Sequence, residues 1–535
     1  MTSIAERLVE ELAARGVKVV FGLPGVHTVE LYRGLAASQI RHVNARHEQG
    51  AGFMADGYAR ASQCSAESTK GRPGVLFVIT GPGLTNALTA VAQARADSSP
   101  ILVISAENPV ASLGLGLGYL HELPAQHAMM KTVALASYQV RAAEDLLPAL
   151  DAAFLRFTEQ RPGPVHIEVP MDVMPQAFST APIRPVPKTA VTGPDLAAVV
   201  ARLDQAKAPI ILAGGGARRC ELALAELAER LDAPVILTIN GRGLMHQHPL
   251  IVPASPTLAA VREAIVASDL VLALGTELGP TDYDQYSDNG MPFLAGLVRV
   301  EICPKQLARH PVELPVCGCL EIVLPALNLA LSDTARCGDG TARAAAARIN
   351  AWDEIGPVMR QQTKLLEAIR EICPQAIFVG DSTQPVYAGN LFYDHDLPGG
   401  WFNSASGFGA LGFAIPAAIG AALAQPERKV ICITGDGGAQ FTLPELMVAV
   451  DEQLSVLFLV WNNLGYGEIE SAMRAAEVSV IGCDPSPPVF SHVAKSCGIA
   501  FEKCSMSRAE VTKAVRGFIE HTGPAMIEID MLSSA

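Results

Sequence analysis

The sequence lacks an excess of positive charge. Its 535 residues include 40 lysines and arginines against 54 aspartates and glutamates, and the formal net charge is −14. Proteins that bind nucleic acids usually carry basic clusters that neutralise a run of phosphates, and no such cluster is present. We therefore expect no nucleic-acid partner.

Long apolar runs and paired cysteines are also missing. No uncharged apolar stretch approaches the ~18 residues that cross a membrane, and Glu6 and Arg7 stand where a signal peptide would be apolar. The eleven cysteines include no C-x-x-C pair, so neither a zinc site nor a dithiol motif is indicated. We expect a cytoplasmic protein without a membrane partner.

What the chain does contain is enough apolar material for several cores. Half of the residues are hydrophobic, and the length predicts three or four domains. Ser3 and Glu6 form a capping-box pattern that opens a helix. Helical and strand-like segments then alternate, as in the apolar runs 18–21, 74–80 and 100–105 and the helix 84–96. Such alternation is typical of a parallel sheet covered by helices, so the class is α/β.

An internal repeat indicates two similar outer domains. Residues 163–169 read GPVHIEV and residues 523–529 read GPAMIEI, and each copy closes a long α/β stretch. The proline-rich segment 181–187 and the polar, small-residue stretch 335–347 are typical of boundaries. We expect three consecutive doubly wound parallel-sheet domains, over 1–180, 190–335 and 355–535.

The middle domain opens with a strand at 209–212 followed by Gly214-Gly215-Gly216. A dinucleotide fingerprint would need a glycine where Arg219 stands. The glycine run is thus either a nucleotide loop or a plain tight turn, and we expect a tight turn without a bound nucleotide.

The strongest chemical signal lies in the last domain. The apolar strand 430–434 ends in Gly435-Asp436-Gly437-Gly438, and the strand 456–461 ends in Asn462-Asn463. Carboxyl ends of parallel strands are where open α/β sheets bind ligands.

Asp436 would repel a phosphate, and no basic residue follows Gly438 closely. Mg²⁺ held by Asp436 and the amide oxygen of Asn463 would resolve this conflict, because the metal would then hold the phosphates. The alternative is a pair of glycine turns with a capping aspartate.

This pair of loops resembles the cofactor motif of thiamine diphosphate enzymes, in the acetolactate-synthase and pyruvate-oxidase group. Two more stretches match the family's other motifs: Arg46-His47-Glu48 with the small residues that follow to Ala59, and Gly409 to Gly420. The resemblance covers the whole chain. It implies a pyrimidine-binding domain, a middle domain and a diphosphate-binding domain, in that order.

The resemblance also implies roles. A protonated Glu48 would hydrogen-bond the pyrimidine of the cofactor and activate it, although an isolated glutamate there is more often a solvated acid at a helix start. The Gly409 carbonyl would accept from the 4′-amino group, and Leu411 would hold the cofactor bent. Gly465 would join Asp436 and Asn463 as a metal ligand. The diphosphate would be contacted by Ser382, Thr383, Gly437 and Gly438.

Some subfamily features are absent. The Phe-Gln-Glu stretch of acetolactate synthases is replaced by residues 117–124, and the flavin-binding stretch of FAD-carrying members is replaced by 275–280, so FAD is not expected. On the substrate side, residues 25–30, 121–124 and 465–470 resemble those of 5-guanidino-2-oxopentanoate (2-ketoarginine) decarboxylases.

The resulting hypothesis is thiamine diphosphate- and Mg²⁺-dependent, non-oxidative decarboxylation of a 2-oxo acid to an aldehyde and CO₂. 5-Guanidino-2-oxopentanoate is the candidate substrate. The alternative is an acetolactate synthase-like carboligase that joins two 2-oxo acids. A silent scaffold is disfavoured because Glu48, Asp436 and Asn463 are all present.

For the substrate, the resemblance places Val26 with Leu411 at the apolar centre and His27 and His121 at proton transfer. Glu122 and Glu468 would pair with a guanidinium, or are ordinary surface acids. The family arrangement implies a homodimer as the minimum and a homotetramer as the full assembly. The alternative is that both ends of one chain meet.

Overall fold

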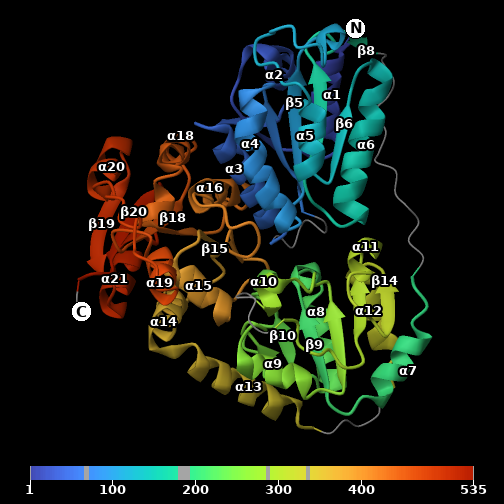
Figure 1. Cartoon of the computed structure of the whole chain (residues 1–535), viewed down its shortest axis with the longest axis vertical. Coiled ribbons are helices and arrows are strands. Elements are labelled where there is room, and N and C mark those ends of the chain that lie inside the picture. The colour runs from blue at the N-terminus through green and yellow to red at the C-terminus, as the bar shows by residue number, and fades with distance from the viewer. Residues whose placement is uncertain (1, 65–70, 179–192, 285–289, 333–337, 534–535) are drawn as a thin grey trace.

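Three α/β domains follow one another along the chain, coloured blue to cyan, green to yellow and orange to red in Figure 1. The computed structural model describes residues 2–64, 71–178, 193–284, 290–332 and 338–533. Each domain contains one sheet of six parallel strands, which confirms the expected fold class. Among the described helices, none has both the length and the apolar character to cross a membrane.

The first sheet has the order β3-β2-β4-β5-β7-β6. Its strands are β2 (Val19–Gly22), β3 (Arg41–Asn44), β4 (Gly74–Val78), β5 (Ile101–Glu107), β6 (Ala136–Gln139) and β7 (Val165–Pro170). One face packs on α1 (Ile4–Ala14), α2 (Val29–Ala36) and α6 (Ala143–Glu159), and the other on α3 (Glu48–Ser62), α4 (Pro82–Ala96) and α5 (Gln126–Val133). The capping box at Ser3 and Glu6 is present at the start of α1, as predicted.

The last sheet repeats this arrangement, with the order β16-β15-β17-β18-β20-β19. Its strands are β15 (Ile377–Gly380), β16 (Trp401–Asn403), β17 (Val430–Gly435), β18 (Val456–Asn462), β19 (Ala500–Ser505) and β20 (Ala525–Asp530). Its helices are α14 (Gly356–Ile372), α15 (Gln384–Leu391), α16 (Ala414–Ala424), α17 (Asp436–Ala439), α18 (Leu446–Asp451), α19 (Gly467–Ala475), α20 (Phe490–Cys497) and α21 (Arg508–Phe518). The two copies of the sequence repeat form β7 and β20, which hold equivalent positions in their sheets.

The middle sheet has the different order β11-β10-β9-β12-β13-β14. Its strands are β9 (Pro209–Ala213), β10 (Val235–Leu237), β11 (Ile251–Val252), β12 (Leu270–Leu274), β13 (Val298–Glu301) and β14 (Leu314–Cys317). Its helices are α7 (Ala197–Gln205), α8 (Glu221–Leu231), α9 (Ala259–Val266), α10 (Pro280–Tyr283), α11 (Pro304–Leu307) and α12 (Leu320–Ala330). This is the strand order typical of dinucleotide-binding folds.

The expected boundary stretch 335–347 contains a helix. Its residues from Gly340 onward form the start of α13 (Gly340–Glu354), which lies between α12 of the middle domain and α14 of the last domain in the chain. Ala344, Ala347 and Ala351 are buried and bring α13 against α9 of the middle domain. Alanine is the best helix former, and packing on a neighbour turns that propensity into a helix. The proline-rich segment 181–187 lies outside the described residues.

The first and last domains share a core where α3 packs on α16, as Figure 1 shows. The two helix backbones approach very closely. A Cβ atom on Gly57 would lie 2.0 Å from the carbonyl oxygen of Ala417, and one on Gly420 would lie 1.9 Å from that of Met54. Only glycine allows this contact, since real Cβ atoms do not come so near to an oxygen.

We predict that Gly57→Ala lowers the free energy of unfolding by about 1 to 3 kcal/mol, because the added methyl group overpacks the helix contact. The matched control is Gly517→Ala in α21, where the nearest atom to a new Cβ is 3.8 Å away. Gly517→Ala should raise the free energy of unfolding by about 0.5 to 1 kcal/mol, since alanine favours the helix more than glycine does. Denaturant unfolding of both variants measures this, and a Gly57→Ala protein as stable as the parent would contradict the packing.

Candidate cofactor and substrate site

The side-chain amide of Asn463 lies between two oxygen atoms at the carboxyl ends of β17 and β18. The side-chain oxygen of Asn463 lies 3.0 Å from Oδ1 of Asp436 and 2.8 Å from the carbonyl oxygen of Gly465. Turning the amide over would let its NH₂ group donate to both oxygens. In that orientation the amide satisfies both oxygens without a metal, whereas in the opposite one all three atoms are acceptors that a cation could join. The structure thus brings the three expected metal ligands together.

The chemistry of this cluster fits magnesium. Oδ2 of Asp436 is buried and has no hydrogen-bond partner in the part of the chain that is described. Burial also raises the pKa of Asp436, because the charged form loses its hydration. Neighbouring ligands in an octahedron with 2.0–2.1 Å metal bonds are about 2.9 Å apart, which matches the separations of the three oxygens.

The loop after Asp436 adjoins the residues expected to contact a diphosphate. Asp436 to Ala439 form the short helix α17, with Gly437 and Gly438 buried. A Cβ atom on Gly435 would lie 3.1 Å from the Thr383 hydroxyl, so Thr383, the N-cap of α15, faces this loop. Ser382 precedes it in the segment between β15 and α15. β15 and β17 are neighbours where the strand order reverses, the usual ligand position in such sheets.

Asp381 ties this strand end to the loop that carries Gly409 and Leu411. Its carboxylate accepts from the N–H groups of Ser382 and Gly412, both at 2.9 Å. Burial raises the pKa of Asp381 to about 6. Gly409 has a φ of +76°, which glycine adopts freely, and the loop then enters α16. The Asp381 carboxylate therefore joins the segment that carries Ser382 to the loop that carries Gly409 and Leu411.

Glu48 belongs to the first domain and is the first residue of α3. The side chain is half-buried, and its Oε2 accepts a hydrogen bond from Nδ2 of Asn86 at 3.0 Å. A Cβ atom on Gly83 would lie 3.6 Å from the other carboxylate oxygen. Glu48 thus points to the start of α4 and is not a freely solvated helix-start acid.

His27 and His121 lie together near the same end of the first sheet. Their ring centroids are 5.1 Å apart, and neither Nδ1 atom has a partner among the described residues. Burial, helped by the neighbouring His121, lowers the pKa of His27. Val26 precedes His27 in a short 3₁₀ turn and is two-thirds exposed. Two imidazoles beside an apolar residue suit proton transfer on a bound substrate.

The two acids expected to meet a cationic substrate differ in their surroundings. The Glu122 carboxylate accepts from the N–H groups of Leu117, Gly118 and Tyr119 at 2.7–3.2 Å. Although burial opposes it, these backbone donors hold the pKa of Glu122 below its usual value. Glu468 lies in the first turn of α19 and is exposed, with no ion pair in the described structure.

The predicted residues therefore form two groups. The first-domain group contains Val26, His27, Glu48, His121 and Glu122, and the last-domain group contains the remainder. Across the described residues, no hydrogen bond or ion pair joins Glu48 or the histidines to the second group. The structure of one chain builds each half of the expected site but does not join them.

Comparison with known proteins identifies the family. Three domains of the thiamine pyrophosphate (TPP, or thiamine diphosphate) enzymes match this chain. The N-terminal TPP-binding domain matches residues 2–134, the central domain 196–327, and the C-terminal TPP-binding domain 381–529. The probable 2-ketoarginine decarboxylase AruI of Pseudomonas aeruginosa is 40% identical over 98% of this chain and 93% of its own length. The chain belongs to the thiamine pyrophosphate enzyme family.

Acetolactate synthases are more distant relatives of this thiamine diphosphate enzyme. Isozyme 1 large subunit of Escherichia coli is 28% identical over 98% of this chain and 93% of its own length. The large subunit of Haemophilus influenzae is 31% identical over 87% and 83%. The expected family and the presence of thiamine diphosphate-binding domains are thus confirmed.

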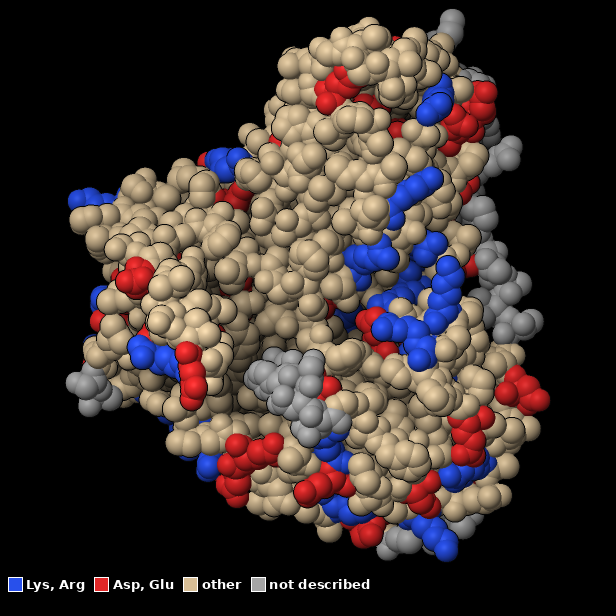
Figure 2. Space-filling view, in the orientation of Figure 1, with Lys and Arg blue, Asp and Glu red and all other residues tan. Residues whose placement is uncertain are grey.

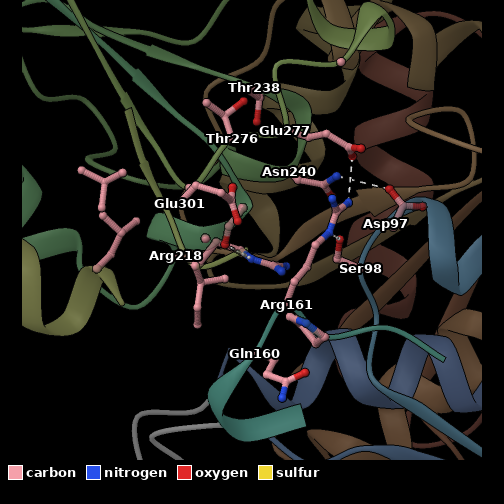
Figure 3. Close-up of a pocket in the computed structure, with 18 of the residues that line it drawn as sticks. Asp97, Ser98, Gln160, Arg161, Arg218, Thr238, Asn240, Thr276, Glu277 and Glu301 are labelled. Atoms are coloured by element: carbon pink, nitrogen blue, oxygen red, sulfur yellow. Dashed lines mark hydrogen bonds and ion pairs between the residues drawn. The ribbon is translucent and has the colours of Figure 1, made fainter. Parts of the chain in front are cut away.

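A separate pocket of about 420 Å³ opens between the three domains of this thiamine diphosphate enzyme. Figure 2 shows basic side chains gathered around this hollow, and Figure 3 shows its lining. Most of its arginines are already paired. Arg161 and Arg309 bind Glu277 at 2.9 and 2.8 Å. Arg218 donates to the carbonyl oxygen of Gly215, and burial lowers its pKa to about 10.

Sequence reasoning missed the residues that support the expected site. Asp381 and Asn86 hold its two halves, and Gln126 holds the loop before α4 by accepting from the Thr80 hydroxyl at 2.8 Å. Asp381 carried a signal, because it follows an apolar strand at the same sheet edge as Asp436. Asn86 and Gln126 carried none, since their partners are distant in sequence.

We predict that Glu122→Gln loosens the turn that it closes. The amide keeps one acceptor oxygen but loses the charge and the second acceptor, so hydrogen exchange at the amides of Leu117, Gly118 and Tyr119 should become faster. Glu144→Gln, an exposed acid in the first turn of α6, is the control. Unchanged exchange at all three amides would show that the carboxylate does not hold the turn.

Proposed function

We propose that the protein decarboxylates a 2-oxo acid to an aldehyde and CO₂, with thiamine diphosphate and Mg²⁺ and without an oxidant. The observation that carries the proposal is the cluster of Asp436, Asn463 and Gly465 oxygens beside a glycine loop. In a thiamine diphosphate enzyme, such a cluster suits the metal that anchors the diphosphate. The 40% identity to a protein named as a probable 2-ketoarginine decarboxylase supports the reaction type.

The chain's own residues would act on three parts of the reaction. Bound thiamine diphosphate supplies the carbon nucleophile and accepts the electrons of the departing carboxylate. Glu48 would hold a proton at the pyrimidine nitrogen N1′, and the Gly409 carbonyl would orient the 4′-amino group. His27 and His121 would move the proton that replaces CO₂ on the substrate carbon. Val26 and Leu411 would keep water from that carbon, since loss of CO₂ disperses charge.

We propose 5-guanidino-2-oxopentanoate as the substrate and Glu468 as the partner of its guanidinium. Glu468 stands next to Gly467 and three residues after Gly465, so it adjoins the metal cluster. No described residue pairs with its carboxylate, so both oxygens can accept from a guanidinium fork. Glu122 is the weaker candidate, because three backbone N–H groups already occupy its carboxylate.

We further propose that two chains complete each site, in a homodimer that pairs into a homotetramer. Apolar side chains beside both halves of the site are more than half exposed: Val26, Leu117 and Leu120 in the first domain, and Phe408, Phe441 and Leu464 in the last. A second copy would cover these side chains and bring Glu48 to the diphosphate half of its partner. The cytoplasmic location stays a prediction.

We propose that no FAD takes part, although the middle domain has the strand order of dinucleotide-binding folds. Glu277, Glu301 and Glu321 line the pocket beside the glycine turn. Their negative charges would repel the diphosphate of FAD. The pocket's arginines do not offset this, because Arg161 and Arg309 pair with Glu277 and Arg219 pairs with Glu321.

The second candidate function is the carboligase, favoured by the acetolactate synthase relatives. Product analysis separates the two functions. With 5-guanidino-2-oxopentanoate alone, a decarboxylase yields one CO₂ and 4-guanidinobutanal for each molecule consumed. A carboligase yields a product with two substrate skeletons joined. Preference for pyruvate with acetolactate as product would overturn the decarboxylase proposal.

Asp436→Ala should abolish Mg²⁺-dependent binding of thiamine diphosphate, because the metal loses its only charged protein ligand in the cluster. Isothermal titration with cofactor and Mg²⁺ measures this loss. Asp451→Ala, a half-exposed acid at the end of α18, serves as the control and should bind normally. Tight Mg²⁺-dependent binding by Asp436→Ala would show that the metal lies elsewhere.

Glu468→Gln should lower kcat/KM for 5-guanidino-2-oxopentanoate on the order of a hundredfold, and leave the value for 2-oxohexanoate nearly unchanged. The neutral substrate lacks the guanidinium, so it loses no ion pair. Glu470→Gln is the matched control, because Glu470 lies on the same helix but pairs with Arg474 at 2.6 Å. Equal effects on both substrates would remove Glu468 from guanidinium recognition.

A further inference from the structure

A buried carboxylate of the last domain holds the start of α3, the helix that begins with Glu48. Glu445 ends the 3₁₀ turn Leu443–Glu445 and is 1% exposed. Its two oxygens lie 3.2 and 3.1 Å from the backbone nitrogen of Arg46, and Oε1 accepts from that of His47 at 3.0 Å. These N–H groups belong to the two residues directly before Glu48.

The surroundings of Glu445 are shaped for this contact. A Cβ atom on Gly50 would lie 2.2 Å from Oε1 of Glu445, so the first turn of α3 leaves open the space that the carboxylate fills. The Arg46 guanidinium pairs with Asp451 instead of Glu445. The carboxylate is thus left to the backbone. A negative charge at a helix N-terminus also interacts favourably with the helix dipole.

The charge state of Glu445 changes in the neutral range. Burial raises its pKa to about 7, against the hydrogen bonds from the Arg46 and His47 N–H groups. Arg46 favours the charged form and Glu48 opposes it. Above about pH 7 the charged carboxylate accepts strong hydrogen bonds from both N–H groups. Below it, the neutral acid is a weaker acceptor.

We propose that Glu445 is a positioning residue that sets the direction of Glu48 toward the cofactor pyrimidine. Glu445 touches neither cofactor nor substrate in this proposal and acts through the backbone of residues 46 and 47. Glu445 stands nine positions after Asp436, so the segment that follows the diphosphate loop contacts the residues before the activating acid of the same chain. The inference rests on the proposed role of Glu48 in thiamine diphosphate activation.

The test is the rate of deuterium exchange at C2 of bound thiamine diphosphate, because this rate reports how well Glu48 activates the cofactor. Glu445→Gln should exchange about ten- to a hundredfold more slowly than the parent, while Mg²⁺ and cofactor bind normally. In the parent, the exchange rate should show an additional rise as the pH increases through about 7, where Glu445 becomes charged. Glu445→Gln should lack this rise. Glu445→Asp should keep the rise at an intermediate rate.

The controls separate this inference from its premises. Glu452→Gln alters an acid of the same segment that pairs with Arg41, and it should exchange like the parent. Parent-like rate and pH profile in Glu445→Gln would overturn the positioning role. If Glu445→Gln loses cofactor binding and also has a lower melting temperature, Glu445 serves folding. This result would overturn the positioning role as well. If Glu48→Gln itself exchanges like the parent, the proposed function fails before Glu445 is in question.

Discussion

The close crossing of α3 and α16 fixes the positions of both halves of the expected site. α3 begins at Glu48, and α16 begins directly after the loop that carries Gly409 and Leu411. Glycines at the crossing let the two backbones approach so closely that a Cβ atom at these positions would clash with the other helix. Because the two helices cannot slide past each other without steric clash, the pyrimidine-side acid and the cofactor loop keep a fixed relation within each chain.

The last domain places two buried acids at one sheet edge and satisfies them differently. Asp381 accepts from backbone N–H groups and binds the Gly409 loop to β15, so its burial is compensated inside the protein. Oδ2 of Asp436 is buried and has no hydrogen-bond partner among the described residues, and Oδ1 lies beside the side-chain amide of Asn463. A buried acceptor cluster of this kind is costly by itself, and a divalent cation would remove the cost. The first acid is therefore structural, and the second suits a metal.

The α/β class, the similar outer domains and the loops at the strand ends followed from the sequence, because periodicity, repeats and glycine turns are local properties. The composition of residues 335–347 does not show that most of them are helical, since alanine-rich segments suit both linkers and helices, and packing on α9 favours the helix. The state of Glu122 could not be predicted, because its three donors come from a turn whose glycines have positive φ. Glu445 gave no signal, since its partners lie about 400 positions away in the chain.

The distribution of hydrogen-bond partners separates fixed machinery from substrate recognition. Glu48, Asp381 and Glu445 each have defined partners, which hold them in one orientation whatever substrate enters. Glu468 has an exposed carboxylate at a helix start, so its direction is free to follow a ligand. A cationic substrate tail needs a carboxylate that is not already compensated, because a satisfied one gains little from a further partner. In the proposed function, recognition of the tail would therefore belong to α19, and activation of the cofactor to the packed start of α3.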